Sequence, residues 1–204
     1  MIKAIVFDMG DVLMDLDKEA CTKAFQDLGF EEITEYIDKA RHKGFWGEME
    51  SGDISGEEFI SECLKHCRPG TTAADIRACI AAFHPGIAAY KIDLLKELKA
   101  KYPLYMLSNN NPLSVDEFIS LGRRHGVEMM DFFREVYFSY QVRMQKPDPE
   151  IYQYAIEHIG LRPEEILFID DNAANCAASV KAGITTVHYD PKSNLRDAIM
   201  AVIS

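Results

Sequence analysis

Long apolar runs, clustered basic residues and a secretory leader are all missing from this sequence. No apolar stretch approaches the ~18–20 residues that a membrane-spanning helix needs. Only 22 Lys and Arg stand against 33 Asp and Glu, and the net charge of −11 argues against a nucleic-acid-binding surface. Asp8 interrupts the first apolar run where a secretory signal would continue. We therefore expect a soluble cytoplasmic protein that binds neither membranes nor nucleic acid. No feature of the sequence defines its oligomeric state.

Cysteine is too scarce and too scattered for a disulfide framework. The five cysteines lie at positions 21, 63, 67, 79 and 176, an odd number that suits reduced thiols in a reducing compartment. Cys63, His66 and Cys67 could suggest a metal site, but a closed zinc site needs four ligands. Both cysteines also fall on the apolar face of a helix that Ser55 and Glu58 are expected to begin as a capping box. We expect them to lie in a hydrophobic core.

The order of apolar patterns predicts an α/β fold. The nearly all-apolar segment 2–8 is typical of a strand buried on both faces of a parallel sheet. Further strands are expected at 102–108, 135–139, 165–169 and 185–189. Helical patterns at 87–101, 113–125, 149–159, 173–183 and 195–203 alternate with them. Such alternation predicts a Rossmann-like three-layer core with a parallel sheet.

Residues 15–85 break this alternation. Helical periodicity recurs at 19–28, 32–45, 56–67 and 73–83, and HisProGly at 84–86 ends it. A chain of 204 residues is long enough for one large domain with an insert. We therefore predict an all-helical cap at 15–85, inserted into a core domain made of residues 1–14 and 86–204.

Polar and charged side chains follow four of the five expected strands. They are Asp8, Ser108, Asn109, Asn110, Lys146, Asp170 and Asp171. Because ligands bind at the carboxyl ends of strands in an open parallel sheet, we expect these side chains to form one site.

The chemistry of this set favours phosphoryl transfer. Three carboxylates repel one another unless a hard divalent cation such as Mg²⁺ lies between them. Mg²⁺ commonly shares its coordination sphere with a phosphate oxygen. Lys146 and the Ser108 hydroxyl supply the positive charge and the hydrogen-bond donor that a phosphoryl group needs. One carboxylate is then available as a nucleophile.

Four segments resemble, in order, the motifs of the haloacid dehalogenase-like hydrolase superfamily. They are FDMGDVL, LSNNN, QKP and FIDDNAANCAAS. The resemblance covers the whole chain, including a helical cap after the first strand. It is greatest to the branch of the α-D-glucose-1-phosphate phosphatase type, whose first motif is FDxGxVL and whose fourth is FDDNxxN. The resemblance implies a Mg²⁺-dependent phosphatase whose partner is a small phosphorylated metabolite, with a sugar phosphate expected.

The resemblance also implies a role for each acidic residue. Asp8 would be the catalytic nucleophile that forms an aspartyl-phosphate. Mg²⁺ would be held by Asp8, the main-chain carbonyl of Gly10 and Asp171. Asp170 would be a direct ligand or a partner of the ligands.

Substrate-binding roles are implied for three more residues. Ser108 and Asn109 would bind the transferring phosphoryl group. Lys146, a catalytic residue, would offset the charge of Asp8 and of the phosphate. Asn175 would orient the acidic pair or the helix that carries it.

Gly10 departs from the superfamily pattern, because most of its phosphatases carry a general acid there. General acid–base catalysis is typically worth ~10²–10⁴-fold. Either the leaving group is a good one, such as an anomeric oxygen, or another group donates the proton. Asp11 or a cap residue could do so, although Asp11 is first expected to be a turn residue.

Two alternatives to a phosphatase remain open. A 2-haloacid dehalogenase also lacks the second acid, but it needs no metal and has no use for Asp170 and Asp171 together. A non-catalytic module that accepts phosphate on Asp8 would need no cap and would have another motif order.

The cap is expected to close over the site and select the substrate. Arg41, His42, Lys43 and Trp46 form a basic and aromatic cluster in this acidic chain. Trp46 could lie either in the core of the cap or on a surface that stacks on a sugar.

Overall fold

A parallel sheet forms the centre of the computed structural model, which describes residues 1–37 and 43–203. Five strands lie in the order β3-β2-β1-β4-β5, and all neighbouring pairs are parallel. They are β1 (Ala4–Phe7), β2 (Leu104–Ser108), β3 (Glu135–Phe138), β4 (Ile166–Asp170) and β5 (Thr185–His188). The predicted α/β fold is confirmed, and each strand overlaps the segment predicted for it.

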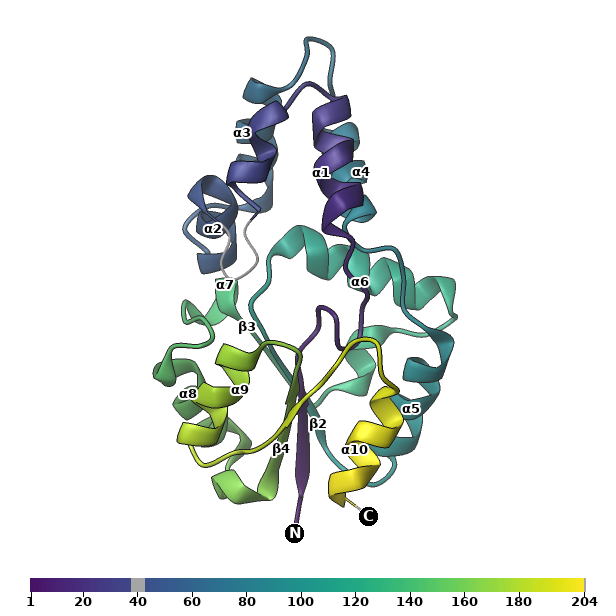
Figure 1. Ribbon diagram of the computed structural model, residues 1–204, viewed down its shortest axis with the longest axis vertical. Helices are drawn as coiled ribbons and strands as arrows, with labels where there is room; N and C mark the ends of the chain where they lie inside the picture. The colour runs from purple at the N-terminus through teal and green to yellow at the C-terminus, as the bar shows by residue number, and fades with distance from the viewer. Residues whose placement is uncertain (38–42, 204) are drawn as a thin grey trace.

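Helices cover both faces of the sheet, as a three-layer core requires (Figure 1). On one face lie α5 (Ala89–Lys99), α6 (Pro112–Arg124) and α10 (Leu195–Ile203), and on the other lie α8 (Pro149–Ile159) and α9 (Ala173–Lys181). Successive side chains of a strand point to opposite faces. Accordingly, Ile5 and Phe7 of β1 enter one hydrophobic core and Ala4 and Val6 enter the other. Burial on both faces explains why β1 is wholly apolar.

The strand order brings the predicted site residues together. The chain passes from β1 to β2 and β3 on one side, and then places β4 and β5 on the other. The carboxyl ends of β1, β2 and β4 therefore meet where the order reverses, the position at which open parallel sheets bind ligands.

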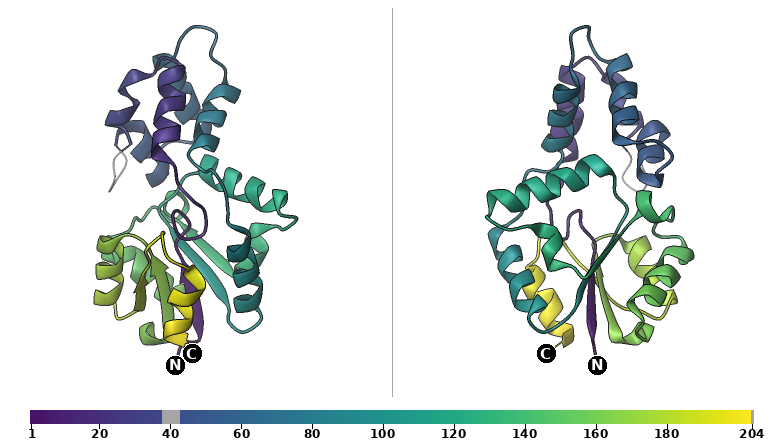
Figure 2. Two further views of the ribbon diagram at one scale, coloured as in Figure 1. Left: turned by 45° about the vertical axis from the view of Figure 1, so that its right-hand side comes forward. Right: turned by 180° about the vertical axis from the view of Figure 1, so that it is seen from behind.

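Four helices stand above this edge of the sheet, and we call them the cap (Figures 1 and 2). They are α1 (Lys18–Asp27), α2 (Gly44–Ser51), α3 (Gly56–His66) and α4 (Ala73–Ala82), with a 3₁₀ turn at Glu31–Glu35. The cap has a hydrophobic core of its own, formed by residues between positions 16 and 83 together with Leu113 of α6. The predicted capping box of Ser55 and Glu58 begins α3.

One helix boundary was predicted wrongly, because the segment 32–45 is not one helix. The 3₁₀ turn ends at Glu35, and α2 begins only at Gly44. Lys43 has an extended backbone with ψ of 168°, and Gly44 has a φ of 53°, so the helical path is interrupted there. The helix then continues to Ser51, beyond the predicted end. The short helix α7 (Ser139–Val142), which directly follows β3, was not predicted from the sequence.

Several side chains of the cap proved to be core residues. Cys63 is fully buried and belongs to the cap core, while Cys67 packs against it. These cysteines belong to no metal-binding cluster, because among the described residues only the acids Asp8, Asp170 and Asp171 have metal-ligand spacing. Trp46 is fully buried among aromatic rings of the cap, including Phe25 and Phe59, whereas Arg41 and His42 lie outside the described residues. No helix of the described chain could cross a membrane.

Candidate active site

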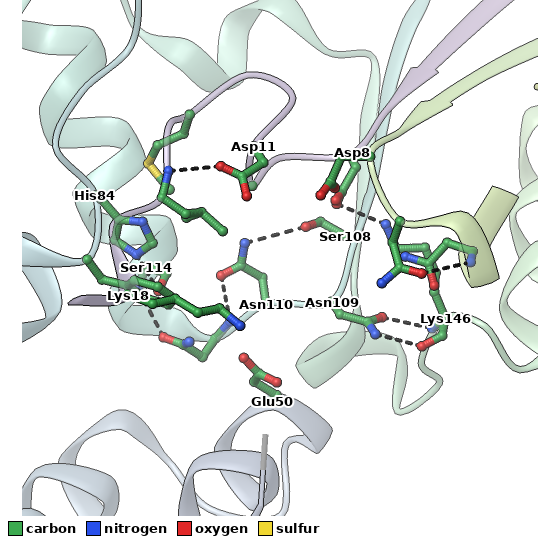
Figure 3. A pocket seen from close by; sticks show the side chains of 18 residues that line it. Asp8, Asp11, Lys18, Glu50, His84, Ser108, Asn109, Asn110, Ser114 and Lys146 are labelled. Atoms are coloured by element: carbon green, nitrogen blue, oxygen red, sulfur yellow. Dashed lines mark hydrogen bonds and ion pairs between the residues drawn. The ribbon is translucent and has the colours of Figure 1, made fainter. Parts of the chain in front are cut away.

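Asp8, Lys146 and Asp170 form a buried chain of charges at the carboxyl edge of the sheet, and Figure 3 shows Asp8 and Lys146 where they face the cavity. The ammonium group of Lys146 lies 2.9 Å from Asp8 Oδ1 and 2.5 Å from Asp170 Oδ2. Asp170 is fully buried, Lys146 is 2% exposed and Asp8 is 9% exposed. One lysine thus holds two carboxylates in place, and Asp8 remains open to the cavity above it.

The pKa values follow from this burial and from the excess of acids. Burial raises the pKa of Asp8 and the charge of Asp170 adds to the effect, against the charge of Lys146 and a hydrogen bond from Ser108. Burial also raises the pKa of Asp171, to about 7, with further contributions from Asp8, Asp170 and Asp11. Burial alone would lower the pKa of Lys146, but its two acidic neighbours outweigh it and the pKa is raised.

The three acids also suit a divalent cation. A ligand oxygen of each lies within 4.8 Å of the others. Both Asp8 and Asp171 line the cavity, and so does Gly10. Hard carboxylate and carbonyl oxygens are the ligands that Mg²⁺ prefers, and its charge would offset the mutual repulsion of the carboxylates. The donor set therefore fits Mg²⁺.

Asp170 differs from Asp8 and Asp171 because it does not line the cavity and because both of its carboxylate oxygens accept hydrogen bonds. Oδ1 accepts from the Asn172 main chain at 2.8 Å, and Oδ2 accepts from Lys146. The amide of Asn175 donates to the same carboxylate, at 3.2 and 3.1 Å. Asn175 therefore holds the Asp170 carboxylate, and its role in orienting the acidic pair or the helix that carries it stays a prediction. These bonds favour Asp170 as a support for Asp8 and Asp171.

The strand end of β2 supplies the groups expected to face a phosphate. Ser108 is 1% exposed, and the Asn110 amide lies 3.4 Å from its hydroxyl. The side chain of Asn109 instead bonds the main chain of Lys146 twice: its amide donates to the carbonyl at 2.7 Å, and its carbonyl accepts from the N–H at 2.8 Å. Asn109 thus positions the loop of Lys146, which the sequence analysis did not foresee.

Asp11 has the turn role predicted for it. Its φ of 54° lies in the left-handed region, which Asp tolerates better than most residues. Asp11 Oδ1 accepts from the Leu16 N–H at 3.1 Å, and the Asp11 N–H donates to the Met14 carbonyl at 2.7 Å. The carboxylate also lines the cavity, and burial raises its pKa.

The cavity above Asp8 holds about 200 Å³, and the cap forms part of its wall. Lys18, Glu50 and His84 all line it, and sequence analysis named none of them as site residues. A signal existed for Glu50, because it lies one helical turn after the buried Trp46 and so shares its inward face. Lys18 carries no comparable signal.

The chain is similar to known proteins along most or all of its length. The family model of haloacid dehalogenase-like hydrolases matches residues 2–183. A D-ribitol-5-phosphate phosphatase of Bacteroides thetaiotaomicron is 30% identical over the full length of both chains.

Two solved structures share the fold. A haloacid dehalogenase family enzyme of the same organism, in complex with magnesium and inorganic phosphate, is 32% identical with a TM-score of 0.88, covering 95% of this chain and 97% of that one. A predicted hydrolase of the family from Porphyromonas gingivalis is 34% identical with a TM-score of 0.89, covering 100% and 98%.

Proposed function

Because the chain belongs to the haloacid dehalogenase-like hydrolase family, we propose that it is a Mg²⁺-dependent phosphatase of small sugar phosphates that acts through an aspartyl-phosphate on Asp8. The observation that carries this proposal is the buried arrangement of Asp8, Lys146 and Asp170 beneath a cavity that Asp171 also faces. The phosphatase relative and the related structure with magnesium and inorganic phosphate bound support it.

Asp8, the carbonyl of Gly10 and Asp171 would hold Mg²⁺. When bound, the ion offsets the charge of the carboxylates and of the phosphoryl oxygens. Two features of this chain support such a site: the raised pKa values of Asp8 and Asp171, and the mutual proximity of the three acids.

In the proposed reaction, a carboxylate oxygen of Asp8 attacks phosphorus. The bond from phosphorus to the leaving oxygen breaks, and the phosphoryl group passes to Asp8. Water then attacks the aspartyl-phosphate, releases inorganic phosphate and restores the carboxylate. Lys146 stabilises the charge of the nucleophile and of the phosphoryl group. The Ser108 hydroxyl and the main-chain N–H of Asn109 would donate to the phosphoryl oxygens.

Gly10 directs the expected substrate towards good leaving groups. No side chain at position 10 can protonate the departing oxygen, and Leu16 covers the adjacent space. An anomeric 1-phosphate suits such a site, because its leaving oxygen departs with less need of a proton than that of a primary alcohol. We therefore expect hexose 1-phosphates to be hydrolysed faster than hexose 6-phosphates and ribitol 5-phosphate.

A metal-controlled assay tests the proposed function. Purified protein with Mg²⁺ should hydrolyse an aryl phosphate and a subset of sugar phosphates, and EDTA should abolish the activity. Asp8→Asn should remove turnover, whereas Asp93→Asn, on the exposed face of α5, should leave it intact. Full activity in EDTA, or in Asp8→Asn, would overturn the proposal.

The missing acid also favours a second candidate, hydrolysis of a carbon–halogen bond by Asp8. This reaction would release halide from a 2-haloacid without metal. The full set of carboxylates that suits a cation weighs against it. Metal-independent halide release would establish this second function.

A further inference from the structure

The cavity has two chemically different ends. Asp8, Ser108 and Lys146 lie at one end, where the phosphoryl group is proposed to bind (Figure 3). Lys18 and Glu50 come from the cap and point into the cavity at the other side, beside Asn110. The second end is therefore where the leaving group of a substrate must lie.

Glu50 is fixed over the cavity by its own main chain. Ser139, fully buried at the start of α7, donates its hydroxyl to the Glu50 carbonyl at 2.7 Å and accepts from the Asn110 N–H at 3.0 Å. Ser139 thus joins the end of α2 to the loop that follows Ser108. The Glu50 residue itself is 8% exposed.

The next turn of the chain strengthens this connection. A Cβ at Gly52 would lie 2.2 Å from the Tyr140 carbonyl oxygen, so the cap passes directly against α7. The Arg143 guanidinium donates to the Gly52 carbonyl at 3.1 Å. Contacts between the cap and the core domain therefore fix the position of Glu50 over the cavity.

Lys18 and Glu50 place opposite charges on the wall of one small cavity. A hydroxyl group can donate to a carboxylate and accept from an ammonium group at once, which neither an anion nor an apolar group can do. A second phosphate or a carboxylate would meet the negative charges of Glu50 and Asp11. The volume of about 200 Å³ is small beside the ~300–1,000 Å³ of typical ligand sites, so bulky nucleotides are disfavoured as well.

We propose that Lys18 and Glu50 bind hydroxyl groups of the leaving group and select a polyhydroxylated carbon chain or ring that bears a single phosphate. This inference rests on the proposed function and assigns its specificity to two residues of the cap. Among monophosphates of small sugars and polyols, the anomeric esters are the expected best substrates, and the expected poor substrates are bisphosphates and sugar-acid phosphates.

The test measures kcat/KM for a sugar or polyol monophosphate relative to that for p-nitrophenyl phosphate, which has no hydroxyl groups. Glu50→Gln and Lys18→Met should each lower this ratio by about 10- to 100-fold, as expected for the loss of a hydrogen bond to a charged group, chiefly through KM. Glu48→Gln, on the exposed face of the same helix, should leave the ratio unchanged. Glu50→Gln should also reduce the discrimination against bisphosphates.

The outcomes separate this inference from the proposed function. Absence of Mg²⁺-dependent hydrolysis of p-nitrophenyl phosphate by the unaltered protein would overturn the proposed function. If that activity is present but both substrates lose rate equally in Glu50→Gln and Lys18→Met, these residues have only a structural role and the inference is wrong.

Discussion

The side chain of Leu16 occupies the space into which a side chain at Gly10 would extend. A Cβ at Gly10 would lie 2.9 Å from Leu16 Cδ1, which is closer than carbon atoms pack. Leu16 belongs to the linker that enters the cap, and its N–H is held by Asp11. An apolar methyl group therefore covers the place from which a general acid at position 10 would act.

This relationship predicts a steep dependence of rate on the leaving group. Across aryl and alkyl phosphates, kcat/KM should fall strongly as the pKa of the leaving alcohol rises, because little protonation assists departure. Gly10→Asp combined with Leu16→Ala should flatten this dependence and raise activity on alkyl phosphates by ~10-fold or more. Leu16→Ala alone is the control. A flat dependence in the unaltered protein would show that another group already donates the proton.

The bonds from Asn175 to Asp170 predict a metal-binding defect in Asn175→Ala. Without the amide, the Asp170 carboxylate loses two hydrogen bonds and orients its neighbours less well. Loss of such a supporting partner typically costs ~10–100-fold in metal affinity. Titration of activity with Mg²⁺ measures the effect, and Val180→Ala, exposed on the same helix, is the control. An unchanged Mg²⁺ requirement would contradict the role given to Asn175.

The paired bonds between Asn109 and Lys146 predict that Asn109→Ala impairs kcat more than KM. The main chain of Lys146 would be held less firmly, so its ammonium group would shift relative to Asp8, and small misplacements of catalytic groups can cost ~10²-fold. Asn109→Asp, which can still accept from the Lys146 N–H, should retain more activity than Asn109→Ala. Equal activity of both variants and the unaltered protein would exclude this positioning role.

Because His84 is buried, we predict that the free energy of unfolding falls as the pH is lowered below 7. It is 4% exposed, its Nε2 lies 2.8 Å from the Ser114 hydroxyl, and burial lowers its pKa to about 4. In the unfolded chain the pKa is about 6.5, so the unfolded state takes up the proton first as pH falls. The free energy of unfolding should therefore fall by about 2 kcal/mol from this residue between pH 7 and pH 5.

Denaturant unfolding at the two pH values, for the unaltered protein and for His84→Gln, measures this contribution. The loss of stability between pH 7 and pH 5 should be smaller in His84→Gln, since glutamine does not titrate. An identical loss in both proteins would show that His84 does not titrate as its burial implies.

The sequence predicted those features of the site that depend on local pattern. Asp8, Ser108 and Asp170 each follow or end an apolar strand, and parallel strands bring their carboxyl ends to one edge, so strand patterns alone were enough to group them. The turn role of Asp11 and the capping box of Ser55 are likewise short-range effects.

Features that depend on contacts between distant segments could not be predicted in this way. The spacing of Glu50 from Trp46 indicates only that Glu50 faces inward; its position over the cavity depends on Ser139, 89 residues later in the chain, which binds its carbonyl, and no periodicity in the sequence indicates that bond. The side chain of Asn109 binds the main chain of Lys146, which is also distant in the sequence. The sequence does not indicate this bond, because an amide can bind a phosphate and a peptide group equally well. The interruption before α2 arises from the backbone of Lys43 and Gly44, which the apolar pattern does not record.

The central claim is that Asp8 carries the phosphoryl group during turnover. Rapid acid quench of the protein during hydrolysis of ³²P-labelled substrate, followed by peptide mapping, tests it most directly. We predict label on the peptide that contains Asp8, and none in Asp8→Asn. Sustained turnover without label on the protein, or label on another residue, would contradict the account.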